Sequence, residues 1–226
     1  KRLILWCESN KNDQRYNHPL KEIYKRWFVK NCTQYLVPGR ASFEYLTSLG
    51  AQESKIYTAV NAVDNDFFTD ACDKNIGNRD VFKQSKGYPE KIILYVGRLI
   101  EEKGIIDLLK AFQLLSCNYR NLGLVLIGSG EGEERFRKFC KEQNIKNVFF
   151  AGFVHQDGLP AYYGAGDVFV LPTHSDVWGL VLNEAMACRL PVVCSDVAGA
   201  ACDLIKTAEN GYTYEKGNIA ELTEAL

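Results

Sequence analysis

The sequence predicts an α/β protein built on doubly wound, Rossmann-like parallel sheets. Short apolar runs typical of strands alternate with longer segments typical of helices from residue 92 to residue 226. The strand-like runs are apolar throughout, which indicates strands that are buried on both faces of a parallel sheet. A shorter series of the same kind precedes them at residues 1–66. Alternation of strands and helices on this pattern is the mark of an α/β fold.

The first 66 residues read as strand, helix, strand, helix, strand. The expected elements are strands at 3–7, 35–37 and 56–60, a helix at 19–32 and a helix that ends at Gly50. Gly50 follows the last apolar residue of its helix, where glycine is preferred. Because this series begins on a strand and is too short for a complete doubly wound domain, we expect it to be the C-terminal portion of one.

Residues 64–91 are polar and contain the breaker Gly87-Tyr88-Pro89, so we expect an irregular linker there. Beyond it we expect strands at 92–96, 124–127, 148–151, 168–171, 192–194 and 212–214, with helices between them. The sequence therefore predicts three parts: the tail of a first domain at 1–66, a linker at 67–91 and a second domain at 92–226.

The amino-acid composition limits the classes of function that this protein can have. The formal net charge of -1 argues against a general nucleic-acid binder, and 46% apolar residues suffice for a core. The eight cysteines are scattered singly without metal-like spacing, so we expect reduced core thiols in a cytoplasmic protein. No apolar run approaches the roughly 20 residues that span a bilayer.

Residues 173–188, THSDVWGLVLNEAMAC, lie where an apolar strand turns into an apolar helix. Ligands of α/β proteins bind at such turns. Gly179 is expected to open the helix, so the unbonded N–H groups of residues 177–181 would attract a phosphate or sugar oxygen. Asp176 precedes the helix, and Glu184 lies about one and a half turns into it, with both side chains leaning toward the N-terminus. Both carboxylates are therefore expected to face one ligand.

A plainer interpretation of the two carboxylates stays open at this point. Asp176 could cap the helix, and Glu184 could lie on a solvated face beside Asn183. Against this, the flanking residues are apolar almost all round, as in a helix packed on a sheet. An ionised Glu184 in that setting needs a polar partner.

The stretch 96–104, VGRLIEEKG, directly follows the first strand of the second domain. Gly97 permits a close turn, and Arg98 and Lys103 can converge on one anion. A diphosphate leaving group is such an anion, because its growing charge must be neutralised. The alternative is that both cations are solvated beside the acidic pair at 101–102.

Three further features give weaker signals. The glycine-rich segment 128–132 follows the wrong strand for a dinucleotide fingerprint, so a tight turn is expected. Val154 follows a strand end. The three histidines have no Ser, Cys or metal-ligand partner in the sequence, and we assign none of them a catalytic role.

Taken together, these stretches resemble the signature of retaining family 4 glycosyltransferases of the GT-B fold. The loop acid, Trp-Gly-Leu, Asn-Glu-Ala-Met-Ala and Pro-Val-Val phrases match at 176–193, and the Gly-Arg-x4-Lys-Gly pattern matches at 97–104. The family's Asn-Gly-Val-Asp phrase corresponds to residues 61–64. The resemblance covers almost the whole chain and implies a donor-binding domain at 92–226, preceded by the tail of an acceptor-binding lobe.

The family's activity is sugar transfer from a nucleotide sugar to an acceptor hydroxyl, with the anomeric configuration kept. The resemblance implies a nucleotide-diphosphate sugar as donor, a carbohydrate or lipid-linked acceptor, and no metal or other cofactor. Arg98 and Lys103 would hold the diphosphate, Asp176 would contact sugar hydroxyls, and Glu184 would bind the ribose. The implied donor-binding residues are Gly97, Val154, Val177, Trp178, Gly179 and Leu180.

The sequence departs from the family at three positions. Asp176 stands where the family usually has Glu, and Arg189 and Ala62 each replace a usual glycine. Two other functions stay open: a nucleotide-sugar epimerase of the same fold, and a nucleotide-sugar-binding module without catalysis. Released sugar phosphate or free epimer in an assay would separate them from a transferase.

The family's acceptor-side histidine would lie upstream of residue 1. We therefore expect this chain to bind a nucleoside diphosphate without transferring sugar by itself. The helix at 19–32 presents an apolar face, surrounded by cations. The face consists of Ile23, Tyr24, Trp27 and Phe28, and the cations are Lys21, Lys25, Arg26 and Lys30. This pattern is expected to be core in an intact lobe, with peripheral contact to an anionic membrane as the alternative.

Overall fold

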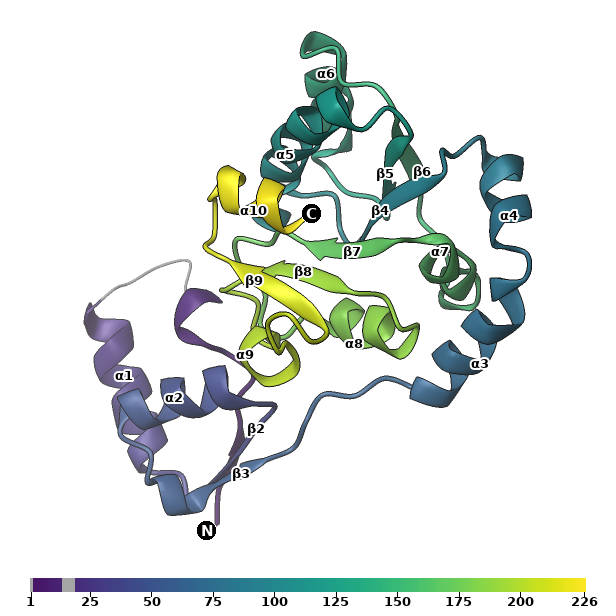
Figure 1. The fold of residues 1–226 in the computed structure, drawn as a ribbon. Coiled ribbons are helices and arrows are strands. Elements are labelled where there is room, and N and C mark those ends of the chain that lie inside the picture. Colours follow the sequence, from purple (N-terminus) through teal and green to yellow (C-terminus); the bar gives the residue numbers. More distant parts are fainter. Residues whose placement is uncertain (1, 14–18) are drawn as a thin grey trace.

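The computed structural model describes residues 2–13 and 19–226 and contains two α/β units (Figure 1). The smaller unit has a parallel sheet of β1 (Ile4–Trp6), β2 (Gln34–Val37) and β3 (Ile56–Thr58), in that order. The larger unit has a parallel sheet in the order β6-β5-β4-β7-β8-β9. Both sheets confirm the predicted fold class.

The smaller unit contains α1 (Pro19–Lys30) and α2 (Arg40–Leu49). As predicted, α2 ends at Gly50, whose φ of 99° is the left-handed conformation that glycine adopts without strain. The core of this unit includes Val37, Leu46 and Leu49. These side chains fill the space between the helices and the three strands.

One face of α1 stays exposed. The exposed fractions of Ile23, Tyr24 and Trp27 are 64%, 62% and 59%. Within the described chain these side chains are therefore not part of the core of the smaller unit. Ile4 and Trp6 of β1 are exposed as well. Both α1 and β1 therefore leave large apolar side chains in solvent.

The expectation of an irregular stretch at 64–91 is wrong. The segment forms α3 (Asn65–Ile76) and α4 (Arg79–Lys86), which pack against the larger unit. Asp64 caps α3 by accepting a hydrogen bond from the Phe67 N–H at 2.9 Å. In α3, Phe68 and Cys72 join the large core, one helical turn apart. Because only this narrow stripe of α3 is buried, most of its residues are polar. The sequence therefore did not indicate a helix here.

The larger unit follows the predicted alternation closely. Its strands are β4 (Lys91–Val96), β5 (Leu122–Ile127), β6 (Val148–Gly152), β7 (Val168–Leu171), β8 (Val192–Ser195) and β9 (Gly211–Tyr214). Its remaining helices are α5 (Ile105–Asn118), α6 (Glu133–Glu142), α7 (Leu159–Ala165), α8 (Leu180–Ala187), α9 (Ala201–Leu204) and α10 (Ile219–Ala225). Central strand residues such as Leu94, Leu126 and Val170 are fully buried, because helices cover both faces of the sheet.

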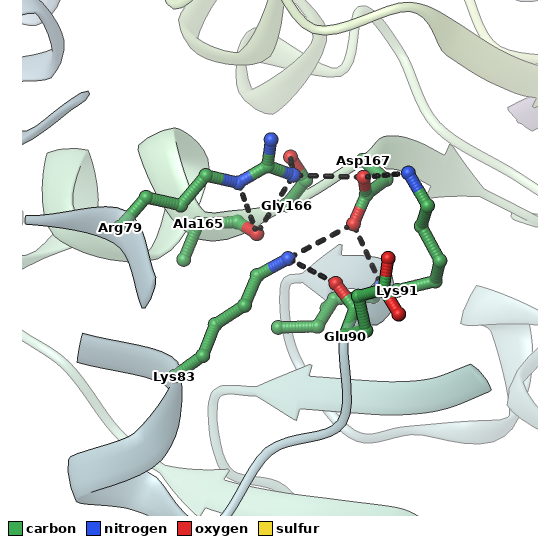
Figure 2. A network of polar contacts seen from close by, with 8 residues as sticks. Arg79, Lys83, Glu90, Lys91, Ala165, Gly166 and Asp167 are labelled. Atoms are coloured by element: carbon green, nitrogen blue, oxygen red, sulfur yellow. Dashed lines mark hydrogen bonds and ion pairs between the residues drawn. The ribbon is translucent and has the colours of Figure 1, made fainter. Parts of the chain in front are cut away.

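A polar network fastens α4 to the amino ends of β4 and β7 (Figure 2). Asp167 accepts hydrogen bonds from the Ile92 N–H at 2.9 Å and from Lys83 Nζ at 3.1 Å. Its other oxygen pairs with Arg79 at 2.8 Å and with Lys91 at 3.3 Å. The Lys83 side chain is only 7% exposed. Asp167 therefore neutralises a buried cation as well as joining two strands.

The cysteine expectation needs one correction. Cys72 of α3 and Cys188, at the end of α8, form a disulfide with a Cα–Cα distance of 5.8 Å. The other six cysteines are free. The neighbouring Arg189 has a positive φ of 58° and pairs with Asp73 of α3. The positions of the cysteines along the sequence could not reveal this disulfide, because the sequence separation of the two cysteines is 116.

Reduction of this disulfide should lower the free energy of unfolding by about 2–4 kcal/mol, since the crosslink restricts a long loop of the unfolded chain. Urea unfolding with and without dithiothreitol measures the difference. Cys188→Ser in the absence of reductant should reproduce it, and Cys117→Ser, which changes an exposed free thiol, should not. Equal stability of the wild type in both conditions would show that the two sulfurs are not bonded.

Candidate active site

The strand order of the larger sheet creates a switch point between β4 and β7. The chain runs from β4 outward through β5 and β6, then returns to β7 on the other side of β4. The loops that follow β4 and β7 therefore diverge at the carboxyl ends of these strands. In open α/β sheets ligands bind in the crevice formed there.

A cleft of about 270 Å³ lies at this point. Its lining residues come from the loops after β4 and β7, from the start of α8 and from the smaller unit. They are Glu8, Asn61, Tyr95, Val96, Gly97, Lys103, Leu171, Asp176, Val177, Trp178, Gly179, Leu180 and Val181. The two stretches predicted from the sequence are thus brought together.

Lys103 and Asp176 form an ion pair in this cleft, with Lys103 Nζ 2.5 Å from Asp176 Oδ2. The exposed fractions of the two side chains are 13% and 17%. Asp176 therefore neutralises the charge of Lys103 in this structure. An incoming phosphate would have to replace Asp176 as the partner of Lys103, which would release the carboxylate for another hydrogen-bond donor.

The turn that holds Lys103 is attached to the loop after β7. The Glu102 carbonyl oxygen accepts hydrogen bonds from the His174 N–H at 2.8 Å and from Thr173 Oγ1 at 3.2 Å. Gly104 follows with a φ of 68°, and a Cβ there would lie 1.8 Å from the Pro172 carbonyl oxygen. Only glycine permits this approach. The His174 ring bonds Asp107 at 2.7 Å, so this histidine braces the loop.

The start of α8 has the predicted geometry. Gly179 precedes the helix with a φ of 95°. In the part of the chain that the structure describes, no backbone acceptor bonds the N–H groups of Gly179, Leu180 and Val181. All three residues line the cleft. A helix N-terminus with unbonded N–H groups attracts anions.

Glu184 does not line this cleft, so the two carboxylates do not share one lining surface. Its Oε2 accepts a hydrogen bond from the Tyr163 hydroxyl at 2.6 Å, which supplies the partner that burial requires. Burial raises the pKa of Glu184 above its usual range, although the Tyr163 hydrogen bond opposes the shift. Glu184 is thus a half-buried carboxylate whose charge is unfavourable in the folded protein.

Arg98 and Val154 also lie outside the residues that line the cleft. Arg98 is exposed, and its carbonyl oxygen accepts a hydrogen bond from the buried Tyr95 hydroxyl at 2.8 Å. Val154 is half-buried against the large core. The backbone of Arg98 is held next to Gly97 by this hydrogen bond, while its side chain is exposed to solvent.

The glycine-rich segment 128–132 supports the Arg98 loop. A Cβ on Gly128 would lie 1.9 Å from the Gly97 carbonyl oxygen, and one on Gly130 would lie 2.4 Å from that of Leu99. The Leu99 N–H donates to Ser129 O at 3.0 Å. These glycines therefore let two loops touch, which agrees with the tight-turn interpretation.

Sequence reasoning missed the contribution of the smaller unit. Asn10 is 1% exposed, and its amide donates to the Asp176 carbonyl oxygen at 3.2 Å. The Asn183 amide reaches Asn61 O at 3.5 Å, and the Asp203 carboxylate accepts from the Arg40 N–H at 2.9 Å. Glu8 also lines the cleft. The only available signal was that Glu8 and Asn10 follow the end of a strand.

Among the described residues, no group of three or more His, Cys, Asp or Glu side chains is arranged to hold a metal ion. None of the helices in that part of the chain combines the length and hydropathy that a bilayer crossing needs.

Comparisons with known proteins agree with this architecture. The sequence model of the family described as glycosyl transferases group 1 matches residues 78–226. An uncharacterised glycosyltransferase of Methanocaldococcus jannaschii is 38% identical over 139 residues, which cover 60% of this chain and 35% of that protein.

Two solved structures share the fold across nearly the whole chain. An Anabaena protein crystallised in complex with UDP has a TM-score of 0.79 at 21% identity, covering 99% of this chain and 61% of that one. Sucrose-phosphate synthase from Thermosynechococcus elongatus has a TM-score of 0.79 at 23% identity, covering 98% and 57%. This chain spans less than two thirds of the length of each of these three proteins.

Proposed function

We propose, from the premise that this chain belongs to the glycosyl transferases group 1, that the protein transfers a sugar from a nucleotide-diphosphate sugar to a hydroxyl of a carbohydrate or lipid-linked acceptor. One observation supports this most. Lys103 and the unbonded N–H groups at the start of α8 converge on one cleft at the sheet's switch point. Such a site suits a diphosphate.

In the proposed reaction the oxygen of the acceptor hydroxyl bonds the anomeric carbon, the bond from that carbon to the diphosphate breaks, and the hydroxyl proton passes to an oxygen of the departing diphosphate. The electron pair leaves on the diphosphate. Lys103 and Arg98 stabilise this growing charge without a metal, and the N–H groups of residues 178–180 assist. We further propose that the anomeric configuration is retained, as the resemblance to family 4 implies.

The other roles follow the chemistry of each side chain. Asp176, once Lys103 turns to the phosphate, accepts hydrogen bonds from sugar hydroxyls. Glu184 binds the ribose after its bond with Tyr163 rearranges, and the backbone near Val154 contacts the base. UDP is the first nucleotide to try, because the Anabaena neighbour was crystallised with it.

A panel of UDP, ADP, GDP and their glucose conjugates in a thermal-shift assay tests the proposal. We expect one nucleoside diphosphate to raise the melting temperature of this 226-residue chain, without sugar transfer by the chain alone. Product analysis with a longer form of the protein then separates transfer from release of free epimer or sugar phosphate. Absence of any shift across the panel would refute a nucleotide-sugar site, and efficient glycosylation by the 226-residue chain would refute the expected need for further acceptor-binding structure.

Glu184→Gln should raise the melting temperature at neutral pH while weakening nucleotide binding. The folded-state pKa of Glu184 is raised, so its stabilising contribution is present at acid pH and is lost as pH rises through the folded pKa. Glutamine keeps an acceptor for Tyr163 without the charge. Loss of a charged hydrogen bond to ribose should cost about 1.5–3 kcal/mol in donor binding. A lower melting temperature of Glu184→Gln together with unchanged nucleotide binding would contradict both the stability and the binding prediction.

We also propose peripheral membrane contact through α1, whose exposed Ile23, Tyr24 and Trp27 accompany Lys21 and Lys30. A basic helix with aromatic side chains binds anionic lipid surfaces. Co-sedimentation with phosphatidylserine vesicles should fall when Lys21 and Lys30 are changed to Glu. If charge reversal leaves sedimentation unchanged, the membrane role is excluded.

A further inference from the structure

Glu8 is the charged side chain that the smaller unit contributes to the cleft. It lies two residues beyond β1 and lines the cleft together with Lys103, Asp176 and the start of α8. The sequence alone indicates no role for Glu8, because one glutamate after a strand forms no motif. Its position nevertheless brings a carboxylate from one unit to the ligand site of the other.

The backbone around Glu8 is held on both sides. The Cys7 N–H donates to Leu36 O at 2.9 Å, and Ser42 Oγ donates to Glu8 O at 2.9 Å. Two residues later, Asn10 accepts the N–H groups of residues 12 and 13 and bonds the Asp176 carbonyl oxygen. This segment is therefore attached to the loop that contains Asp176, so the place of Glu8 in the cleft is set by structure on both units.

The charges around the cleft favour a neutral ligand group beside Glu8. Three of the described lining residues are charged: Glu8, Lys103 and Asp176. Lys103 and Asp176 neutralise each other in their ion pair. Within the described chain Glu8 has no salt-bridge partner and remains an exposed carboxylate. A carboxylate repels phosphate, whereas it accepts hydrogen bonds from hydroxyl groups, which donate strongly to an ionised acceptor.

We propose that Glu8 is a specificity residue for the sugar of the donor. Its carboxylate accepts hydrogen bonds from sugar hydroxyls, while the diphosphate lies toward Lys103 and the start of α8. The smaller unit then takes part in donor recognition as well as in acceptor binding. This inference rests on the proposed function and extends it to a residue outside the predicted donor domain.

The test compares two ligands that differ only by the sugar. Calorimetric affinities of UDP and UDP-glucose are measured for the wild type, Glu8→Ala and Glu8→Gln, with the ADP or GDP pair used if the wild type prefers that base. Glu8→Ala should weaken UDP-glucose about 10- to 100-fold, the range for a charged hydrogen bond, and should change UDP binding less than about twofold. Glu8→Gln should fall between, because its amide oxygen still accepts a hydrogen bond.

Glu53→Gln is the matched control, since it removes a negative charge from an exposed position of the same unit outside the cleft. It should leave both affinities unchanged. Equal weakening of UDP and UDP-glucose by Glu8→Ala would mean that Glu8 only supports the fold of the cleft, and unchanged affinity for both would mean that it does not contact the donor; either result overturns the inference. A wild type that binds no nucleotide overturns the proposed function itself, and this inference with it.

Discussion

Lys103→Ala should reduce sugar transfer about 100- to 1,000-fold in a form of the protein that is active, the effect of removing one group that stabilises charge in the transition state, or about 2.7–4 kcal/mol. The charge on the diphosphate grows as the glycosidic bond breaks, so the loss should appear in turnover as well as in donor affinity. Arg98→Ala should act in the same direction. Steady-state kinetics and donor titration of the same variants measure both quantities.

The ion pair between Lys103 and Asp176 determines which control variants are needed. Lys103→Ala leaves Asp176 without its cation, and that carboxylate would then repel the phosphate. Asp176→Asn combined with Lys103→Ala should recover part of the donor affinity but not the turnover. Lys138→Ala, which removes an exposed cation of α6, should change neither. Intact turnover in Lys103→Ala and Arg98→Ala, with turnover abolished by Glu184→Gln, would show that these roles are wrongly assigned.

Asp167→Ala should lower the free energy of unfolding by about 3–5 kcal/mol, the usual cost of removing one partner of a buried ion pair. The substitution leaves Lys83, with its side chain 7% exposed, without a counter-charge. It also removes the acceptor of the Ile92 N–H. Urea unfolding measures the loss. Asp80→Ala, at an exposed position of α4, should lie within about 0.5 kcal/mol of the wild type.

The pH dependence of unfolding gives a second test of Asp167. Burial alone would raise its pKa, but the hydrogen bond from the Ile92 N–H and the contacts with Lys83 and Arg79 outweigh burial and lower it. A lowered carboxyl pKa gives stability that is present above the unfolded pKa and is lost as pH falls through the folded one. The wild type should therefore lose stability below about pH 4 more steeply than Asp167→Asn. Parallel pH profiles would contradict the assigned network.

Local signals in the sequence predicted much of the fold. Gly50 and Gly179 lie at helix boundaries in left-handed conformations, as their positions after and before apolar helices indicated. The continuous apolar runs became the six parallel strands of the larger unit. Helix α3 escaped prediction because only a narrow stripe of it is buried, and its partners, such as Tyr163, come from a distant part of the chain.

The candidate site was predictable only in part, for a similar reason. The loops with Gly97, Lys103 and residues 176–180 meet because the strand order reverses between β4 and β7, and each loop showed its own motif. Pairings across long separations left no local pattern. Lys103 bonds Asp176 across 73 positions, and Asn10 reaches the same loop across 166. Such partners depend on topology and on the docking of two units.

We propose that a nucleoside diphosphate binds in the cleft at the carboxyl ends of β4 and β7. Two-dimensional NMR of the ¹⁵N-labelled chain, titrated with UDP, ADP and GDP in turn, tests it directly. We predict saturable shifts of the amides of Gly97, Lys103 and residues 177–181 for at least one nucleotide, with the amides around Arg79 and Lys91 at the opposite end of the sheet unmoved. Saturable shifts confined to that opposite end, or none with any of the three nucleotides, would contradict the account.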